Sequence, residues 1–201
     1  MTILITGCVI TLGLSIRRHY RGVAKQVAQA DALFATAKEQ SPVEAPALDP
    51  KAPTAVFLVG SSLGTGMHCL LATLKMFPNH FRNFIFIRVG EIDAEALSDE
   101  KLIEELRVDV DRDLAHFVNW CHRHKMAATS RHTFAADVVY GLDHLAEEVL
   151  AEYPNSLFFA SQLLFENDNV LIRQLHNQTA LEMQRHLHLR GVSMVILPMR
   201  V

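Results

Sequence analysis

The sequence has few cysteines and no strong excess of positive charge. Cys8, Cys69 and Cys121 are the three cysteines, and they form no C-x-x-C pair. An odd number of widely spaced cysteines argues against a disulfide framework or a zinc ribbon and is typical of a reduced compartment. The formal net charge of -3 excludes a generally basic surface, so we expect no nucleic-acid partner.

Patterns typical of metal sites and catalytic sites are also missing. The pairs His122/His124 and His186/His188 are spaced by two residues on predicted helices, which directs the two members of a pair to different faces. No Ser/His/Asp or Cys/His arrangement lies in a nucleophile-elbow context. We therefore expect no metal, no catalytic residues and no enzymatic activity, with a small enzyme on the same fold as the third hypothesis.

The sequence does contain apolar runs that alternate with amphipathic helical patterns. The first run, residues 54–60, is apolar from Ala55 to Val59 without alternation, which is typical of a strand buried on both faces of a parallel sheet. Gly60, Gly64 and Gly66 permit a sharp turn into the helix that follows. This strand-turn-helix unit is the pattern that the rest of the chain repeats.

Four more strands and three more helices are predicted in the same way. The strands are residues 84–89, 129–135, 156–160 and 192–197, with Gly90 ending the second; the helices are residues 98 or 100 to 125, 138–153 and 169–189. Such a series requires parallel crossover connections. We predict an α/β fold, a five-stranded parallel sheet of order 3-2-1-4-5 in a Rossmann-like three-layer sandwich, preceded by an amino-terminal helix.

The amino-terminal 53 residues differ in composition from the rest. Residues 1–16 carry no charge and are followed at once by Arg17 and Arg18, the arrangement at the cytoplasmic end of a membrane helix. A buried soluble helix is the alternative. We predict a juxtamembrane helix at 17–40, a proline-rich linker at 41–53 and an α/β domain at 54–201.

Two stretches carry a resemblance to a known family. Arg-Arg-His-Tyr at 17–20, and Leu-His-Asn-Gln-Thr-Ala at 175–180 followed by a strand ending in Leu197-Pro198, resemble the carboxyl-terminal tails of permeases in the amino acid/polyamine/organocation superfamily. The potassium-uptake-type members are the most similar subset, and their cytosolic domain is similar to universal stress proteins.

The resemblance implies a non-catalytic regulatory domain of a secondary transporter for amino acids or potassium. It implies a location at the inner membrane, with residues 1–21 meeting the bilayer, residues 17–201 in the cytoplasm and a membrane transport core as partner. A free-standing nucleotide-binding protein of the universal-stress type is the alternative. A homodimer is expected through residues 194–201, an apolar edge strand with no later strand to cover it.

Ligands of such sheets bind beyond the carboxyl ends of the strands where the strand order reverses, here between the first and fourth strands. The candidate nucleotide- or anion-binding residues are Gly60, Ser61, Ser62, Gly64, Thr65, Gly66, Glu91, Ser161, His176 and Asn177. The serines and the threonine are donors for a phosphate at a helix amino terminus. Tight helix packing is the alternative reason for the glycines, and a structural role is the alternative for His176.

The resemblance implies an adenine nucleotide or cyclic di-AMP as the ligand. Universal stress proteins that bind ATP carry a glycine motif after the fourth strand, whereas residues 161–177 contain no glycine. This departure argues against ATP binding through that motif. The acidic stretch at 91–113 is predicted to be a solvated helix face, with docking on basic loops of a transport core as the alternative.

Overall fold

The computed structural model describes residues 6–7, 45–92, 100–164 and 178–200, and the structural statements below concern these residues. The strands are β1 (Thr54–Leu58), β2 (Asn83–Glu91), β3 (Ala127–Ala135), β4 (Ser156–Leu164) and β5 (Met194–Arg200). The helices are α2 (Leu63–Met76), α3 (Glu100–Arg123), α4 (Val138–Glu152) and α6 (Gln178–Leu189).

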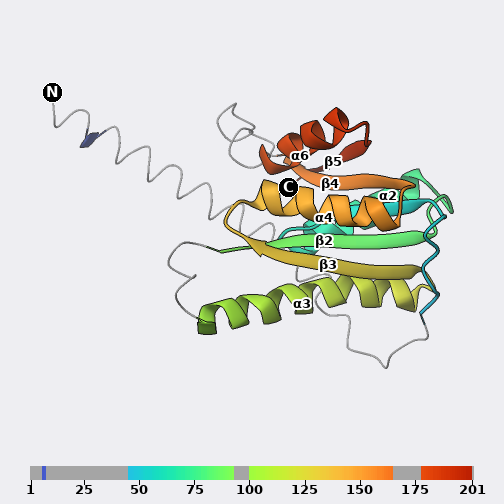
Figure 1. Ribbon diagram of the computed structural model, residues 1–201, viewed down its shortest axis with the longest axis horizontal. Helices are drawn as coiled ribbons and strands as arrows, with labels where there is room; N and C mark the ends of the chain where they lie inside the picture. The colour runs from blue at the N-terminus through green and yellow to red at the C-terminus, as the bar shows by residue number, and fades with distance from the viewer. Residues whose placement is uncertain (1–5, 8–44, 93–99, 165–177, 201) are drawn as a thin grey trace.

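The strands form one sheet in the order β3-β2-β1-β4-β5, and all four neighbouring pairs are parallel. Helices α2 and α3 pack on one face, and α4 and α6 pack on the other, which gives three layers (Figure 1). The predicted fold class and strand order are therefore confirmed. The predicted amino-terminal helix lies, apart from residues 6–7, outside the described residues.

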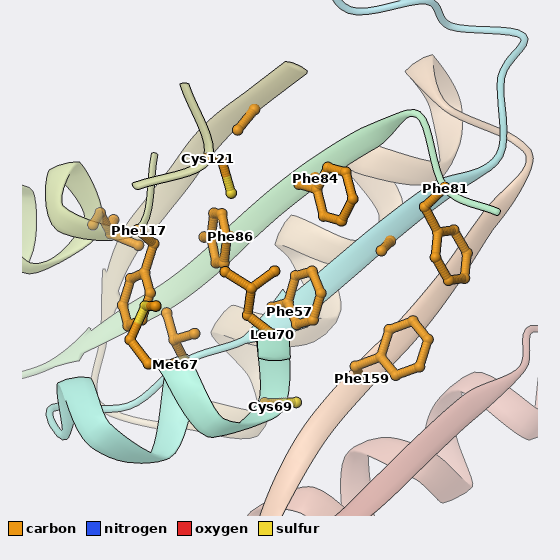
Figure 2. Packing of buried hydrophobic residues seen from close by; sticks show 14 of the residues in the cluster. Phe57, Met67, Cys69, Leu70, Phe81, Phe84, Phe86, Phe117, Cys121 and Phe159 are labelled. Carbon is orange, nitrogen blue, oxygen red and sulfur yellow. The ribbon is translucent and has the colours of Figure 1, made fainter. Parts of the chain in front are cut away.

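Strand β1 is the centre of both hydrophobic layers. Ala55, Val56 and Phe57 have no solvent exposure. Val56 faces the core under α4 and α6, whereas Phe57 faces the core under α2 and α3. The ring of Phe57 stacks 5.2 Å from that of Phe86 and 5.5 Å from that of Phe159 (Figure 2). Full burial of such side chains is worth about 1.5–3 kcal/mol each. Strand β1 therefore stabilises both core layers at once.

Gly90 does not end the second strand, and that prediction is wrong. It lies inside β2 opposite Phe134, and a Cβ at this position would come within 2.5 Å of the Phe134 ring. A glycine in a strand interior often marks such a close approach. Strand β2 therefore continues to Glu91, which pairs with Ala135.

The last two strands run further than predicted. Strand β4 continues past Ala160 to Leu164, because β5 pairs with it from Phe158 to Leu164. Strand β5 extends to Arg200 and includes Pro198. Proline cannot donate a ladder hydrogen bond, and it is tolerated here because β5 lies at the edge of the sheet.

Residues 45–53, the described part of the predicted linker, lie against the amino ends of the strands. The buried side chain of Asn83 holds them: its Oδ1 accepts from the N–H of Asp49 at 3.1 Å, and its Nδ2 donates to the Asp49 carbonyl at 2.6 Å. Nδ2 also donates to Oγ1 of Thr54 at 2.9 Å. Leu48 packs on the core under α4 and α6. One buried amide thus connects this 45–53 segment to β1 and β2.

We expect Asn83→Ala to lower the free energy of unfolding by about 2–3 kcal/mol, because it removes the three hydrogen bonds that the buried Asn83 amide makes with Asp49 and Thr54. Urea denaturation of the full chain measures this. The control is Asn155→Ala, which removes one exposed hydrogen bond to the Lys51 carbonyl and should cost less than about 1 kcal/mol. Equal losses in the two variants would contradict the central role of Asn83.

Candidate functional site

The carboxyl edge of the sheet has a step at β1. Leu58, its last residue, pairs with Ile87 and Ala160, whereas β2 and β4 continue four residues further on either side, to Glu91 and Leu164. The chain leaves β1 at this step and enters α2 through residues 59–62. This is the point where the strand order reverses, at which ligands of doubly wound sheets bind.

Ser62 caps the amino end of α2. Its hydroxyl oxygen accepts from the N–H of Thr65 at 3.2 Å, and the Thr65 hydroxyl donates to the Ser62 carbonyl at 2.9 Å. The Thr65 hydroxyl proton is therefore used within the cap rather than held out for a ligand. Gly60 and Ser61 are exposed beside it. The amino end of α2, with its partial positive charge, thus faces solvent through these two residues.

Ser161 joins α2 to β4. It lies within β4, opposite Leu197, and its hydroxyl donates to the Thr65 carbonyl at 2.9 Å. The structure thus brings together three predicted site residues, Ser62, Thr65 and Ser161, but their hydrogen bonds fasten the helix to the sheet. These bonds fix the position of the α2 amino end relative to the step.

The buried thiols of Cys69 and Cys121 are not nucleophiles at neutral pH. Burial raises the pKa of Cys69 to about 12, although a hydrogen bond with Ser161 partly offsets the shift. Burial likewise raises the pKa of Cys121 to about 12. Both remain protonated and inert at neutral pH, since thiol chemistry requires the thiolate.

The three glycines of the turn have different surroundings. A Cβ on Gly66 would lie 2.5 Å from Cζ of Phe117, so Gly66 permits the close packing of α2 against α3. Gly64 is buried in the first turn of α2. A Cβ on Gly60 would meet nothing within 4 Å. The packing explanation for the glycines therefore holds at Gly66, while Gly60 leaves open space above the step.

One of the remaining predicted residues, Glu91, belongs to the described residues. Glu91 is exposed at the end of β2, where it pairs with β3 rather than with β1. His176 and Asn177 lie outside the described residues. The described part of the predicted site around the step is therefore the turn at residues 60–66, supported by Ser161.

Sequence reasoning missed a buried ion pair between the sheet and α3. Nη1 of Arg88 lies 2.6 Å from Oδ2 of Asp113, and the two side chains are 8% and 12% exposed. Asp113 belongs to the acidic stretch predicted to be solvated, and at this residue the prediction is wrong. A single arginine within an otherwise apolar strand is the signal that could have indicated a buried partner.

His122 and His124, one of the two predicted histidine pairs, bond to main-chain carbonyl groups. A ring nitrogen of His122 lies 3.0 Å from the Ala128 oxygen, and one of His124 lies 2.7 Å from the Trp120 oxygen. Within the described ranges, no group of three or more His, Cys, Asp or Glu side chains is arranged to hold a metal ion.

Comparisons with known proteins identify the fold. No protein-family model matches the sequence, and no curated protein matches it. The chain is similar to a crystal structure of a protein from the universal stress protein family from Burkholderia pseudomallei, with 18% identity and a TM-score of 0.51. The alignment covers 73% of this chain and 96% of that one. The described domain therefore has the universal-stress-protein fold.

No helix in the described ranges combines the length and the apolar character that spanning a membrane requires. Apart from residues 6–7, the stretch predicted to be membrane-embedded, 1–16, lies outside these ranges.

We expect Gly66→Ala to lower the free energy of unfolding by about 1–3 kcal/mol, because its methyl group would overlap the buried Phe117 ring. The matched control is Gly60→Ala, which enters open space and should change stability by less than about 0.5 kcal/mol. Chemical denaturation of the two variants tests the pair. If Gly66→Ala is as stable as the wild type, the packing of the Phe117 ring does not require a glycine at this position.

Proposed function

We propose that this chain is a non-catalytic regulatory domain that binds an adenine nucleotide or cyclic di-AMP and controls a secondary transporter of the amino acid/polyamine/organocation type. The observation that carries the proposal is the solvent-facing amino end of α2 at the step beside β1. A helix amino terminus at a strand-order reversal favours phosphate through its N–H groups and its dipole. Gly60 adds space for close approach, and Ser61 adds a hydroxyl.

The mode of phosphate binding differs from that of the glycine motif of ATP-binding universal stress proteins. Residues 161–177 contain no glycine, so the proposed phosphate contact is with residues 60–63 instead. Ser161 supports this contact indirectly, because it anchors Thr65 and thereby the first turn of α2. Binding therefore depends on a preformed helix end rather than on a flexible loop.

The transporter assignment rests on the sequence rather than on the fold. The uncharged residues 1–16, followed by Arg17 and Arg18, are typical of a membrane helix that ends in the cytoplasm. The motif at 175–180 resembles the tails of these permeases. In this proposal ligand binding shifts the population of domain arrangements, and residues 17–53 carry the shift to the membrane partner.

We expect Ser61→Asp to weaken binding of the nucleotide about tenfold or more, because a carboxylate beside a phosphate costs more than about 1.4 kcal/mol. Isothermal titration of the full chain with ATP, AMP and cyclic di-AMP measures this. Loss of binding would not reflect unfolding, since an acid in this position favours the helix dipole. Ser193→Asp adds the same charge at an exposed position at the opposite edge and should bind as the wild type does. If the wild type binds none of the three, the nucleotide proposal is wrong.

We also expect the native protein to be membrane-bound. An antibody raised against residues 45–201 should detect it in the membrane fraction, and alkaline carbonate should not release it. A soluble polypeptide of 22.6 kDa that leaves the membrane fraction on washing would contradict the transporter assignment.

A free-standing nucleotide-binding protein is the second candidate function. It is favoured by the coverage of the solved universal stress protein, 96% of which aligns with this chain, so the domain has the size of that whole protein. The fractionation experiment separates the two candidates, because only the transporter assignment requires a membrane-bound chain. The nucleotide titration applies to both.

A further inference from the structure

A cavity lies at the edge of the sheet opposite the proposed nucleotide site. It has a volume of about 700 Å³ and lies at the amino ends of β2 and β3, where the 45–53 segment meets the ends of α2 and α3. Ligand cavities of proteins commonly have volumes of about 300–1,000 Å³. The topological rule for doubly wound sheets does not predict a site at this edge, so the cavity needs its own explanation.

The floor of the cavity is apolar and largely aromatic. Phe81 and Phe84 are buried, and Leu74 and Phe77 from the end of α2 line the same wall. The rings of Phe77 and Phe81 lie 5.7 Å apart in an edge-to-face arrangement. Such a floor suits the flat or chain-like apolar body of a small molecule.

The rim of the cavity is basic. Arg82 and Lys125 are exposed on it, and no carboxylate of the described residues forms an ion pair with either cation. The exposed His124 lies between them and α3. Asp49 is the acidic residue among those lining the cavity, and its Oδ1 accepts from the N–H of Lys51.

The helix dipoles do not cancel this positive charge. The carboxyl ends of α2 and α3 each contribute roughly half a negative charge at this edge. Lys75 lies in the last turn of α2 and offsets that contribution. Among the residues that line the cavity, Asp49 balances one of the two cations Arg82 and Lys125, which leaves an excess of about one positive charge. An anion is therefore the electrostatic complement of the rim.

Two turns that line the cavity have left-handed backbone at residues other than glycine. Asn79 has φ 58° and Lys125 has φ 59°. This conformation is unfavourable for a lysine, which is rarely found there. At Lys125 this backbone belongs to the carboxyl-terminal cap of α3, because the N–H of Met126 donates to the Cys121 carbonyl at 3.0 Å and the N–H of Lys125 donates to the His122 carbonyl at 2.9 Å. The cap places Lys125 among the residues that line the cavity.

We infer that this cavity binds a small amphipathic anion, a carboxylate or phosphate carried on an aryl or short acyl body. The anionic group would lie between Arg82 and Lys125, and the apolar body would lie on Phe77 and Phe81. Pro46, Ala47 and Asp49 form part of the wall, so an occupant also holds the 45–53 segment on the domain. Binding at this cavity is independent of the proposed function. A regulatory effect of that binding through residues 17–44 rests on the proposed function.

The chain contains its own reporter for this cavity. Trp120 is the single tryptophan, and its ring stacks on that of His124 at 3.9 Å. Titration of the full chain with 3-phenylpropanoate should therefore change the tryptophan fluorescence, with a dissociation constant of about 1 mM for so small a ligand. The neutral 3-phenylpropanamide should bind about tenfold more weakly, and inorganic phosphate should compete with the acid.

The variants Arg82→Gln and Lys125→Asn should each remove most of the preference for the acid over the amide. Both positions are exposed, and asparagine accepts the left-handed backbone at 125, so the fold is kept. Lys75→Gln is the matched control: it removes an exposed cation of the same edge that does not line the cavity, and it should retain the preference. Hydrogen exchange at the Asp49 amide should slow when the acid binds.

Equal affinity for the acid and the amide would overturn the inference, as would a saturating fluorescence change that is unaltered in both rim variants. No fluorescence change and no slower exchange at Asp49 would overturn it as well. These outcomes are separate from the nucleotide test, because Ser61→Asp alters the opposite edge of the sheet. Failure at one edge therefore leaves the proposal for the other edge in place.

Discussion

The burial of β1 on both faces is the constraint on which the rest of the structure depends. A five-residue strand with neighbours on both sides and a hydrophobic layer above and below can occupy only the middle of the sheet. Phe57 then determines where the rings of Phe86 and Phe159 lie, as Figure 2 shows. The shortness of β1 relative to β2 and β4 produces the step at the carboxyl edge. The position of the candidate nucleotide site is thus a consequence of core packing.

Helix α2 connects the two edges of the domain. Its amino end lies at the step beside β1, and its last residues line the cavity at the opposite edge, about 20 Å away for a helix of 14 residues. Ser161 holds its first turn on β4, and Gly66 holds it close to Phe117. A helix held at these points does not slide easily.

The parts of the fold that depend on the local sequence pattern were predictable. The apolar runs and the helix periodicity predict the five strands and their order, and the structure has both. Contacts between distant residues were not predictable. The sequence predicts a strand end at Gly90, because the Phe134 ring that requires a glycine there lies 44 residues later in the chain.

The candidate site was predictable to a similar extent. The turn at 60–66 was correctly located at the reversal of strand order, but the capping role of Thr65 and the packing role of Gly66 depend on Ser62 and Phe117. The cavity at the amino edge had no sequence signal, because Arg82 and Lys125 come from loops separated along the chain and only the folded sheet brings their turns together.

The way in which the 45–53 segment is attached determines whether it can act as a switch. The described attachment includes Leu48 on the core, the buried Ala52, a main-chain hydrogen bond from Arg82 to the Pro53 carbonyl, and hydrogen bonds with Asn83 and Asn155, each worth about 0.5–1.5 kcal/mol net. A ligand at a hundred times its dissociation constant stabilises the state that binds it by about 2.7 kcal/mol. Under the inference above, an occupant of the cavity would add about this much free energy to the attachment, an increment similar to that of a few of these hydrogen bonds. A linker buried by a large apolar surface would not respond to so weak a ligand.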